Sequence, residues 1–393
     1  MKEKYRKMKN LFLRQSYLDS WEDYQRSLNK SNFIIWDYFI ITASNEEQAE
    51  NYREQIRCRL EEGLLPAQTH YAVLSDPEGK RVGSGGATFN VLRYIREQEP
   101  DRENPFADRR ILVIHSGGDS KRVPQYSATG KLFAPVPREL PNGHGSTLFD
   151  EFVIGMAGVP SRIKDGMLVL SGDVLLLFNP LQIDSQFHGA AAISIKEPVD
   201  IGKDHGVFLN SGKDCVRSFL HKQTEESLRE SGAVNEQGYV DLDTGAILFD
   251  SGLLMALLGL ITTENKLDCN KFAKFVSEKA RVSFYGDFLY PLAESSTLEN
   301  YYREKPEGED TPELRECRKE IWEALHDFSL KLICLSPAEF IHFGTTWELL
   351  QLVTHDVEDY EFLDWKKQVL STSASGDYAA HNSYIGKKVR TGK

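Results

Sequence analysis

The chain has 393 residues, of which 40% are hydrophobic and 27% charged, an ordinary composition for a globular protein large enough for two or three domains. Its formal net charge of −12 argues against a general binder of nucleic acids or membrane surfaces, because both are anionic and would repel it. A local basic pocket for phosphates remains compatible with that charge.

The first predicted elements alternate between helices and strands. Residues 11–30 and 45–62 have the pattern of amphipathic helices, and the apolar run 33–44 between them indicates a buried strand. The alternation then continues, with strands at 70–75, 110–116 and 166–173 and helices at 87–98 and 146–157. Short apolar strands that alternate with helices predict an α/β fold with a mostly parallel sheet covered on both faces.

Beyond residue 190 the predicted strands follow one another more closely, which indicates a mixed extension of the sheet around a second substrate. They cover 190–197, 205–210, 215–222 and 239–250, and residues 251–330 have largely helical patterns. The tail, HNSYIGKKVRTGK (381–393), has the pattern of one hexapeptide coil of a left-handed β-helix. One coil cannot bury its own apolar face, so we expect the chain to stop just inside a further domain.

Cysteines and termini point to an intracellular protein. The five cysteines are an odd number, lie far apart and form no CxxC pair, so neither a disulfide framework nor a zinc site is expected. The start of the chain lacks the uninterrupted apolar run of a secretory signal, and no segment is apolar enough for a membrane helix. We therefore expect a cytoplasmic location.

Two Gly-rich segments and one aspartate fall at the carboxyl ends of predicted strands, where ligands of parallel sheets bind. The first segment is Gly83–Thr88, ahead of a helix. Its small residues would let backbone N–H groups approach phosphates, and the helix N-terminus would add positive potential. An ordinary tight turn is the alternative, because the segment is neither a GxxxxGK[ST] loop nor a strict GxGxxG loop.

The second segment runs from His115 to Lys131 and contains three cations, Lys121, Arg122 and Lys131, with Gly117 and Gly118. Such donors and fixed positive charges are what a triphosphate and a departing pyrophosphate require. A solvated basic loop is the alternative.

Several further side chains are candidates with a structural alternative. Asp173 ends a buried strand and can hold Mg²⁺, although a turn or cap aspartate is the alternative. Asp243 and Asp287 are other carboxylates near strand ends, each more often structural than a ligand. Lys222 can bind a sugar phosphate, but a lone lysine is usually solvated. His115 can be a buried core histidine.

Together these segments resemble the fucose-1-phosphate guanylyltransferase family, which includes the N-terminal part of the bacterial bifunctional L-fucokinase/GDP-fucose pyrophosphorylases. The resemblance covers most of residues 70–393. It rests on GSGGAT (83–88), HSGGDSKRVPQYSATGKLF (115–133), LVLSGDVLLLF (168–178), HGVF (205–208), DTGAILF (243–249) and HFGTTWELL (342–350).

The resemblance implies a nucleotidyltransferase-type, Rossmann-like three-layer sandwich with a mixed, mostly parallel sheet. It implies a helical and strand extension packed on the core (1–65), a catalytic domain (66–350), and a linker with the start of a truncated left-handed β-helix (351–393). In the bifunctional enzymes a sugar-kinase domain follows, and the same native fusion is implied here.

The resemblance also implies site roles and a reaction. Simpler sugar nucleotidyltransferases end their loop in Gly-Thr-Arg, whereas Phe89 follows Thr88 here, so the arginine's role would pass to Lys121 or Arg122. The implied assignments are nucleotide binding by Gly83, Ser84, Gly85, Gly86, Ala87, Thr88, Gly117 and Gly118; catalysis by Lys121, Arg122, Lys131 and Asp173; sugar phosphate binding by Lys222 and Asp243; and Mg²⁺ binding by Asp173 and Asp287.

The implied reaction is in-line attack of L-fucose 1-phosphate on the α-phosphorus of GTP, assisted by Mg²⁺. It yields GDP-L-fucose and pyrophosphate and needs no general base, because the attacking phosphate is already ionised near neutral pH. Since the residues alone do not fix the base, uridylyl transfer to another sugar 1-phosphate stays open. A catalytically silent sugar-nucleotide-binding module is the third hypothesis, while a P-loop kinase lacks its loop.

Overall fold

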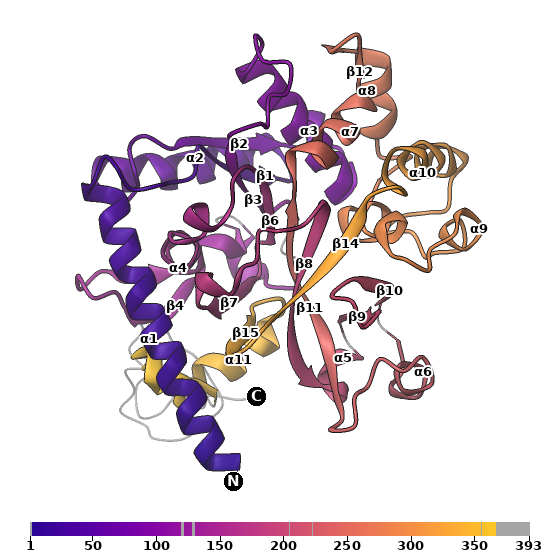
Figure 1. Cartoon of the computed structure of the whole chain (residues 1–393). Coiled ribbons are helices and arrows are strands. Elements are labelled where there is room, and N and C mark those ends of the chain that lie inside the picture. The colour runs from indigo at the N-terminus through magenta and orange to yellow at the C-terminus, as the bar shows by residue number, and fades with distance from the viewer. Residues whose placement is uncertain are drawn as a thin grey trace, which may run out of the picture.

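A nine-stranded mixed sheet runs through the molecule, and helices lie on both of its faces (Figure 1). The computed structural model describes residues 2–118, 122–127, 130–203, 205–221, 223–354 and 356–366. The strands of the sheet are β1 (Tyr38–Ala43), β2 (His70–Ser75), β3 (Arg110–His115), β6 (Gly166–Ser171), β8 (Gly189–Pro198), β9 (Gly206–Asn210), β10 (Val216–His221), β11 (Tyr239–Phe249) and β14 (Ser329–Leu335). One path through it is β10-β9-β11-β6-β3-β1-β2, and β8 joins β11 to β14.

Three small antiparallel ladders accompany this sheet: β4 (Pro135–Glu139) with β5 (Gly145–Thr147), β7 (Val174–Phe178) with β15 (Ala338–His342), and β12 (Thr262–Thr263) with β13 (Lys266–Leu267). The α-helices are α1 (Lys2–Asn29), α2 (Glu46–Glu61), α3 (Gly83–Gln98), α4 (Leu148–Gly155), α5 (Val199–Gly202), α6 (Glu225–Glu230), α7 (Ser251–Gly259), α8 (Cys269–Phe275), α9 (Leu298–Tyr301), α10 (Pro312–Leu325) and α11 (Thr346–Thr354). None of the helices in the described ranges is long and apolar enough to cross a bilayer.

The N-terminal half of the sheet is parallel. Strands β2, β1, β3 and β6 pair in that order, all in one direction. Successive side chains of β3 point to opposite faces: Leu112 belongs to the apolar core that includes Phe149 of α4, and Val113 to the core that includes Phe89 of α3. Burial on both faces explains why β1, β3 and β6 are nearly continuous apolar runs, and it confirms the predicted layers of helix, sheet and helix.

The C-terminal half of the sheet is antiparallel around β11, which pairs with β6, β8 and β9. This matches the closely spaced strands expected beyond residue 190, and the sheet is mixed. Strand β14 pairs with β8 in parallel, so the C-terminal half also contains one parallel pair. The predicted β-helix coil at 381–393 lies outside the described residues.

The predicted boundary at residue 65 is wrong, because β1 lies inside the sheet, between β2 and β3. Residues before 65 therefore contribute one strand to the central sheet, in addition to the helices α1 and α2 that pack around it. Helix α1 does lie against the outside of the molecule, beside α4 and β7 (Figure 1). Lys9 of α1 forms an ion pair of 2.6 Å with Glu339 of β15, which ties the two ends of the described chain together.

Candidate active site

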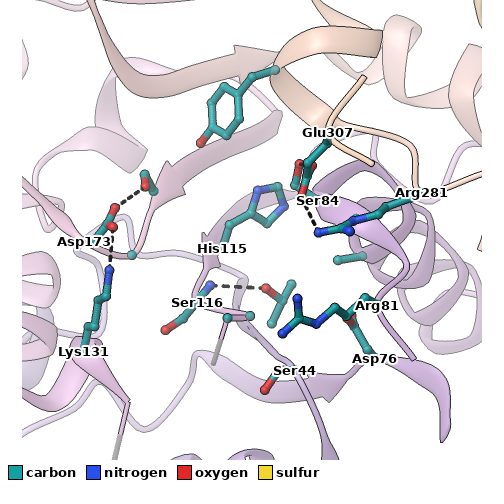
Figure 2. Close-up of a pocket in the computed structure, with 18 of the residues that line it drawn as sticks. Ser44, Asp76, Arg81, Ser84, His115, Ser116, Lys131, Asp173, Arg281 and Glu307 are labelled. Atoms are coloured by element: carbon teal, nitrogen blue, oxygen red, sulfur yellow. Dashed lines mark hydrogen bonds and ion pairs between the residues drawn. The ribbon is translucent and has the colours of Figure 1, made fainter. Parts of the chain in front are cut away.

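A cleft of about 550 Å³ opens at the carboxyl ends of the parallel strands (Figure 2). The strand ends meet there because the register sets Ala43 beside Ser75 and His115 beside Ser171. The cleft is lined by Thr42, Ser44, Asp76, Arg81, Gly83, Ser84, Ala87, His115, Ser116, Gly117, Gly118, Arg122, Lys131, Ser171, Gly172, Asp173, Arg281, Tyr285 and Glu307.

At one end of the cleft, Lys131 and Asp173 form an ion pair with 3.1 Å between Nζ and Oδ2. Their side chains are 15% and 21% exposed. The ammonium also donates to the carbonyl of Gly344 at 2.9 Å, and the Ser171 hydroxyl donates to the other oxygen of Asp173 at 2.7 Å. Burial alone raises the pKa of Asp173, but Lys131 and its other partners hold that pKa below its ordinary value. The site therefore presents a fixed cation and an ionised carboxylate side by side.

The segment after β15 holds this pair in place. Strand β15 pairs with β7, and the backbone N–H of Phe343 donates to the carbonyl of Asp173 at 2.7 Å. His342 lies with its Nε2 3.9 Å from Asp173 and its Nδ1 2.9 Å from Glu348. The motif at 342–350 thus contributes to the site through the backbone and through His342, two contacts that its sequence did not reveal.

The second Gly-rich segment borders the cleft, as predicted. Gly117, Gly118, Arg122 and Lys131 line it, whereas Lys121 lies outside the described residues. Gly130, ahead of Lys131, has a φ of 72°, and a Cβ atom there would lie 2.0 Å from the hydroxyl of buried Tyr52. Glycine is therefore required at this position for Lys131 to reach Asp173.

The first Gly-rich segment is not a loop, because α3 begins at Gly83. Only Gly83, Ser84 and Ala87 of the segment line the cleft. A Cβ on Gly85 would lie 2.6 Å from Cγ1 of Val282, and one on Gly86 would lie 2.9 Å from Cβ of Val82. These two glycines permit close packing of α3 against its neighbours. The prediction that they contact the nucleotide phosphates is therefore not supported by their surroundings. Thr88 is also buried and bonds to the carbonyl of Ser84 at 2.9 Å.

His115 lies at the end of β3 and is a buried histidine that borders the cleft. Its Nε2 is 3.1 Å from the Thr88 hydroxyl, and its ring packs edge-on against Phe284. Burial lowers the pKa of His115 to about 4, so the imidazole is neutral near pH 7. It shapes the floor of the site without adding charge.

Of the two residues predicted to bind the sugar phosphate, the structure describes only Asp243. Lys222 lies outside the described residues. Asp243 sits at a bulge in β11, where its carboxylate accepts a hydrogen bond of 2.8 Å from the N–H of Gly245. It is not among the residues lining the cleft, but Tyr285, whose hydroxyl bonds to Gly245, is. Burial raises the pKa of Asp243 to about 6.

Asp287, predicted as a metal ligand, is instead half of a buried ion pair outside the cleft. Its carboxylate accepts from Nε of Arg318 at 2.8 Å and from the N–H of Ser283 at 2.7 Å. Both charged side chains are almost fully buried, and Arg318 also donates to the carbonyls of Tyr301 and Glu304. Because both carboxylate oxygens are already occupied, the prediction is corrected to a structural role: Asp287 fixes the segment 283–288 against α10.

The chain matches a known protein family over most of its length. Residues 104–393 match the family model described as "Fucose pyrophosphorylase domain". The chain belongs to the fucose pyrophosphorylase family. This confirms the family that its motifs indicated.

The curated relatives that match this chain are longer than it is. It is 29% identical over 348 residues to a human fucose-1-phosphate guanylyltransferase, covering 82% of this chain and 56% of the human protein. A bifunctional fucokinase/GDP-fucose pyrophosphorylase from Arabidopsis thaliana is 26% identical, over 95% of this chain and 37% of its own length. An L-fucokinase/L-fucose-1-P guanylyltransferase from Bacteroides fragilis is 25% identical, over 72% of this chain and 27% of its own. The chain thus spans about half or less of these relatives.

Several residues that line the cleft were not predicted from the sequence. Ser44 and Asp76 directly follow β1 and β2, so the rule that located Asp173 at a strand end would also have found them. Arg281, Tyr285 and Glu307 come from segments far along the chain that fold back over the start of α3. No local pattern marks these three, because only the tertiary packing brings them to the cleft.

We predict that Asp243→Asn changes the pH dependence of stability. The folded-state pKa of about 6 lies above the ordinary 3.8, so the folded state keeps a proton that the unfolded state releases. The wild type should therefore lose stability as pH rises from about 4 to 6, by roughly 2–3 kcal/mol, and the variant should not. Urea unfolding at pH 4 and pH 7 measures the difference, with Asp327→Asn as an exposed control. Parallel pH profiles for wild type and Asp243→Asn would contradict the buried, protonated carboxyl.

We also predict that loss of either partner of the Asp287–Arg318 ion pair destabilises the fold. Asp287→Asn and Arg318→Met should each lower the free energy of unfolding by about 3–5 kcal/mol, because each leaves an unpaired buried group. The double variant should lose less than the sum of the two. Chemical denaturation without added metal provides the measurement. Wild-type stability combined with lost Mg²⁺ binding in Asp287→Asn would restore the ligand role.

Proposed function

We propose that this chain transfers a guanylyl group from GTP to L-fucose 1-phosphate, producing GDP-L-fucose and pyrophosphate. The observation that carries the proposal is the Lys131–Asp173 pair at the carboxyl edge of the sheet, in a chain of the fucose pyrophosphorylase family. The names of the relatives support the choice of substrates.

The charges of the cleft suit two anionic substrates. Lys131 and Arg122 line the cleft, and so do Gly117 and Gly118 of the second Gly-rich segment. A volume of about 550 Å³ lies within the range of roughly 300–1,000 Å³ usual for small-ligand sites.

The proposed step is a displacement at the α-phosphorus of GTP. A phosphate oxygen of fucose 1-phosphate forms the new P–O bond, while the bond from the α-phosphorus to the bridging oxygen breaks and pyrophosphate leaves with that electron pair. The attacking oxygen is already ionised, so no protein base is required, and neutral His115 takes no part in proton transfer. Lys131 would hold the phosphates in line and offset their mutual repulsion.

Asp173 is the proposed ligand of Mg²⁺. Proteins usually hold this ion through one or two carboxylates, with waters and substrate phosphates completing its shell. Asp173 fits that pattern, since it is ionised, partly exposed and lines the cleft. Within the described ranges there is no group of three or more His, Cys, Asp or Glu side chains placed to hold a metal ion. When bound, Mg²⁺ would supply positive charge for the developing pyrophosphate.

We also propose that a sugar-kinase domain is natively fused to this chain, as the names of the Arabidopsis and Bacteroides relatives describe for those proteins. Such a kinase would supply the sugar 1-phosphate next to the site that uses it.

The test is pyrophosphate release by the purified chain with Mg²⁺ and fucose 1-phosphate, comparing GTP, ATP, UTP and CTP. Release should be fastest with GTP. Lys131→Met and Asp173→Asn should each lower kcat by roughly 100-fold or more, because each removes charge stabilisation in the transition state. Lys164→Met is the matched control, since the Lys164 side chain is 83% exposed and remote from the cleft.

Other outcomes point to the rival functions. Faster release with UTP would favour uridylyl transfer, and binding of GTP without turnover would favour a silent binding module. Loss of activity in Lys131→Met together with an equal loss of thermal stability would make the ion pair structural.

A further inference from the structure

The cleft has chemically different ends, and the mechanism above uses only one of them. Figure 2 shows Lys131 and Asp173 on one side and Asp76, Arg81, Arg281 and Glu307 on the opposite side. The two carboxylates at the second end offset the charge of the two arginines, so this end lacks the net positive charge that a triphosphate requires. The uncharged base of the nucleotide is the part that such an end can accept.

Asp76 differs from the other carboxylates of the cleft in how few partners it has. Asp173 is paired with Lys131, and Glu307 lies near Arg281, at 3.9 Å, and receives a hydrogen bond from Ser84. Among the described residues, no lysine or arginine forms an ion pair with Asp76, whose carboxylate receives a backbone hydrogen bond from Val82. It therefore keeps acceptor capacity toward the cleft.

The surroundings of Asp76 favour a ligand that brings donors. Burial raises the pKa of Asp76 to about 7, the backbone N–H of Val82 opposes this, and Glu307 adds to it. A buried carboxylate short of hydrogen-bond donors is costly, and a ligand that supplies N–H groups removes that cost.

We propose that Asp76 selects guanine by accepting hydrogen bonds from N1–H and the N2 amino group of the base. The proposal rests on the guanylyl transfer above and assigns the base specificity that the sequence left open. Guanine presents these two donors next to each other, and a carboxylate accepts both. Adenine offers one donor beside an acceptor nitrogen, and uracil places carbonyls on both sides of its single donor. Arg81 and Arg281 lie at the same end, where guanine O6 requires a donor.

The position of Asp76 in the fold supports this orientation. It directly follows β2 at the edge of the sheet, and Ser44 follows β1 beside it. A base bound there would direct the phosphates along the carboxyl edge, past Gly117 and Gly118 toward Lys131. The triphosphate of GTP then lies near Lys131, and the N1–H and N2 edge of guanine lies at the carboxylate of Asp76.

The experiment compares GTP, ITP, XTP and ATP with the wild-type chain and with Asp76→Asn. ITP lacks the N2 amino group, and XTP carries an oxygen in its place, to which the amide of the variant can donate. We expect the wild type to bind ITP about tenfold more weakly than GTP. Asp76→Asn should weaken the binding of GTP by about 10- to 100-fold, and it should bind XTP more tightly than GTP. Glu78→Gln, an exposed carboxylate in the same turn, should retain the wild-type order.

Two readouts separate this proposal from the proposed function. Equilibrium binding of each nucleotide, without sugar phosphate, tests Asp76 alone, and pyrophosphate release tests the transfer. Binding that follows the expected order without turnover would support Asp76 and overturn the transfer. The proposed role of Asp76 would be overturned if the wild type turns over GTP while a folded Asp76→Asn keeps the wild-type ratios of affinity, GTP to ITP and GTP to XTP. Failure of the wild type to bind GTP would overturn it as well.

Discussion

Parallel pairing of β2, β1, β3 and β6 places the carboxyl ends of four strands along one edge of the sheet. Strand β2, at the edge of the sheet, is only partly buried. Strands β1, β3 and β6 are buried on both faces, so none of them can slip by one residue without moving apolar side chains out of both cores. The edge is therefore rigid, and the turns that follow it inherit fixed positions. Asp76, His115 and Asp173 all owe their place in the cleft to this constraint.

The cationic end of the cleft depends on a second layer of support. Lys131 is held by Asp173 and by the carbonyl of Gly344, from a segment 213 residues further along the chain. Tyr52 leaves room only for glycine at position 130, which directs the lysine inward. A site built this way has its charges in place before a substrate arrives, which is how preorganised electrostatic stabilisation works.

The strands and their order of appearance were predictable because apolar runs and turn residues are local signals. Lys131, Arg122 and Asp173 were predictable as cleft residues because loops after parallel strands meet at one edge of the sheet. Roles that depend on a distant partner were not predictable. Gly85 packs against Val282, and Asp287 pairs with Arg318, contacts that no spacing in the sequence discloses. The boundary at residue 65 failed for a related reason, because pairing order within a sheet does not follow order along the chain.

The packing of helix α1 against the end of the chain affects how the protein folds during translation. Leu13, Tyr17 and Tyr24 of this helix belong to the same apolar core as Ile341 and Trp365, and Arg6 forms an ion pair with Asp359, 353 positions later. The helix therefore emerges during translation long before the surface that covers it. Until then its apolar face has only early partners such as α4, and a chaperone would have an exposed target throughout most of synthesis.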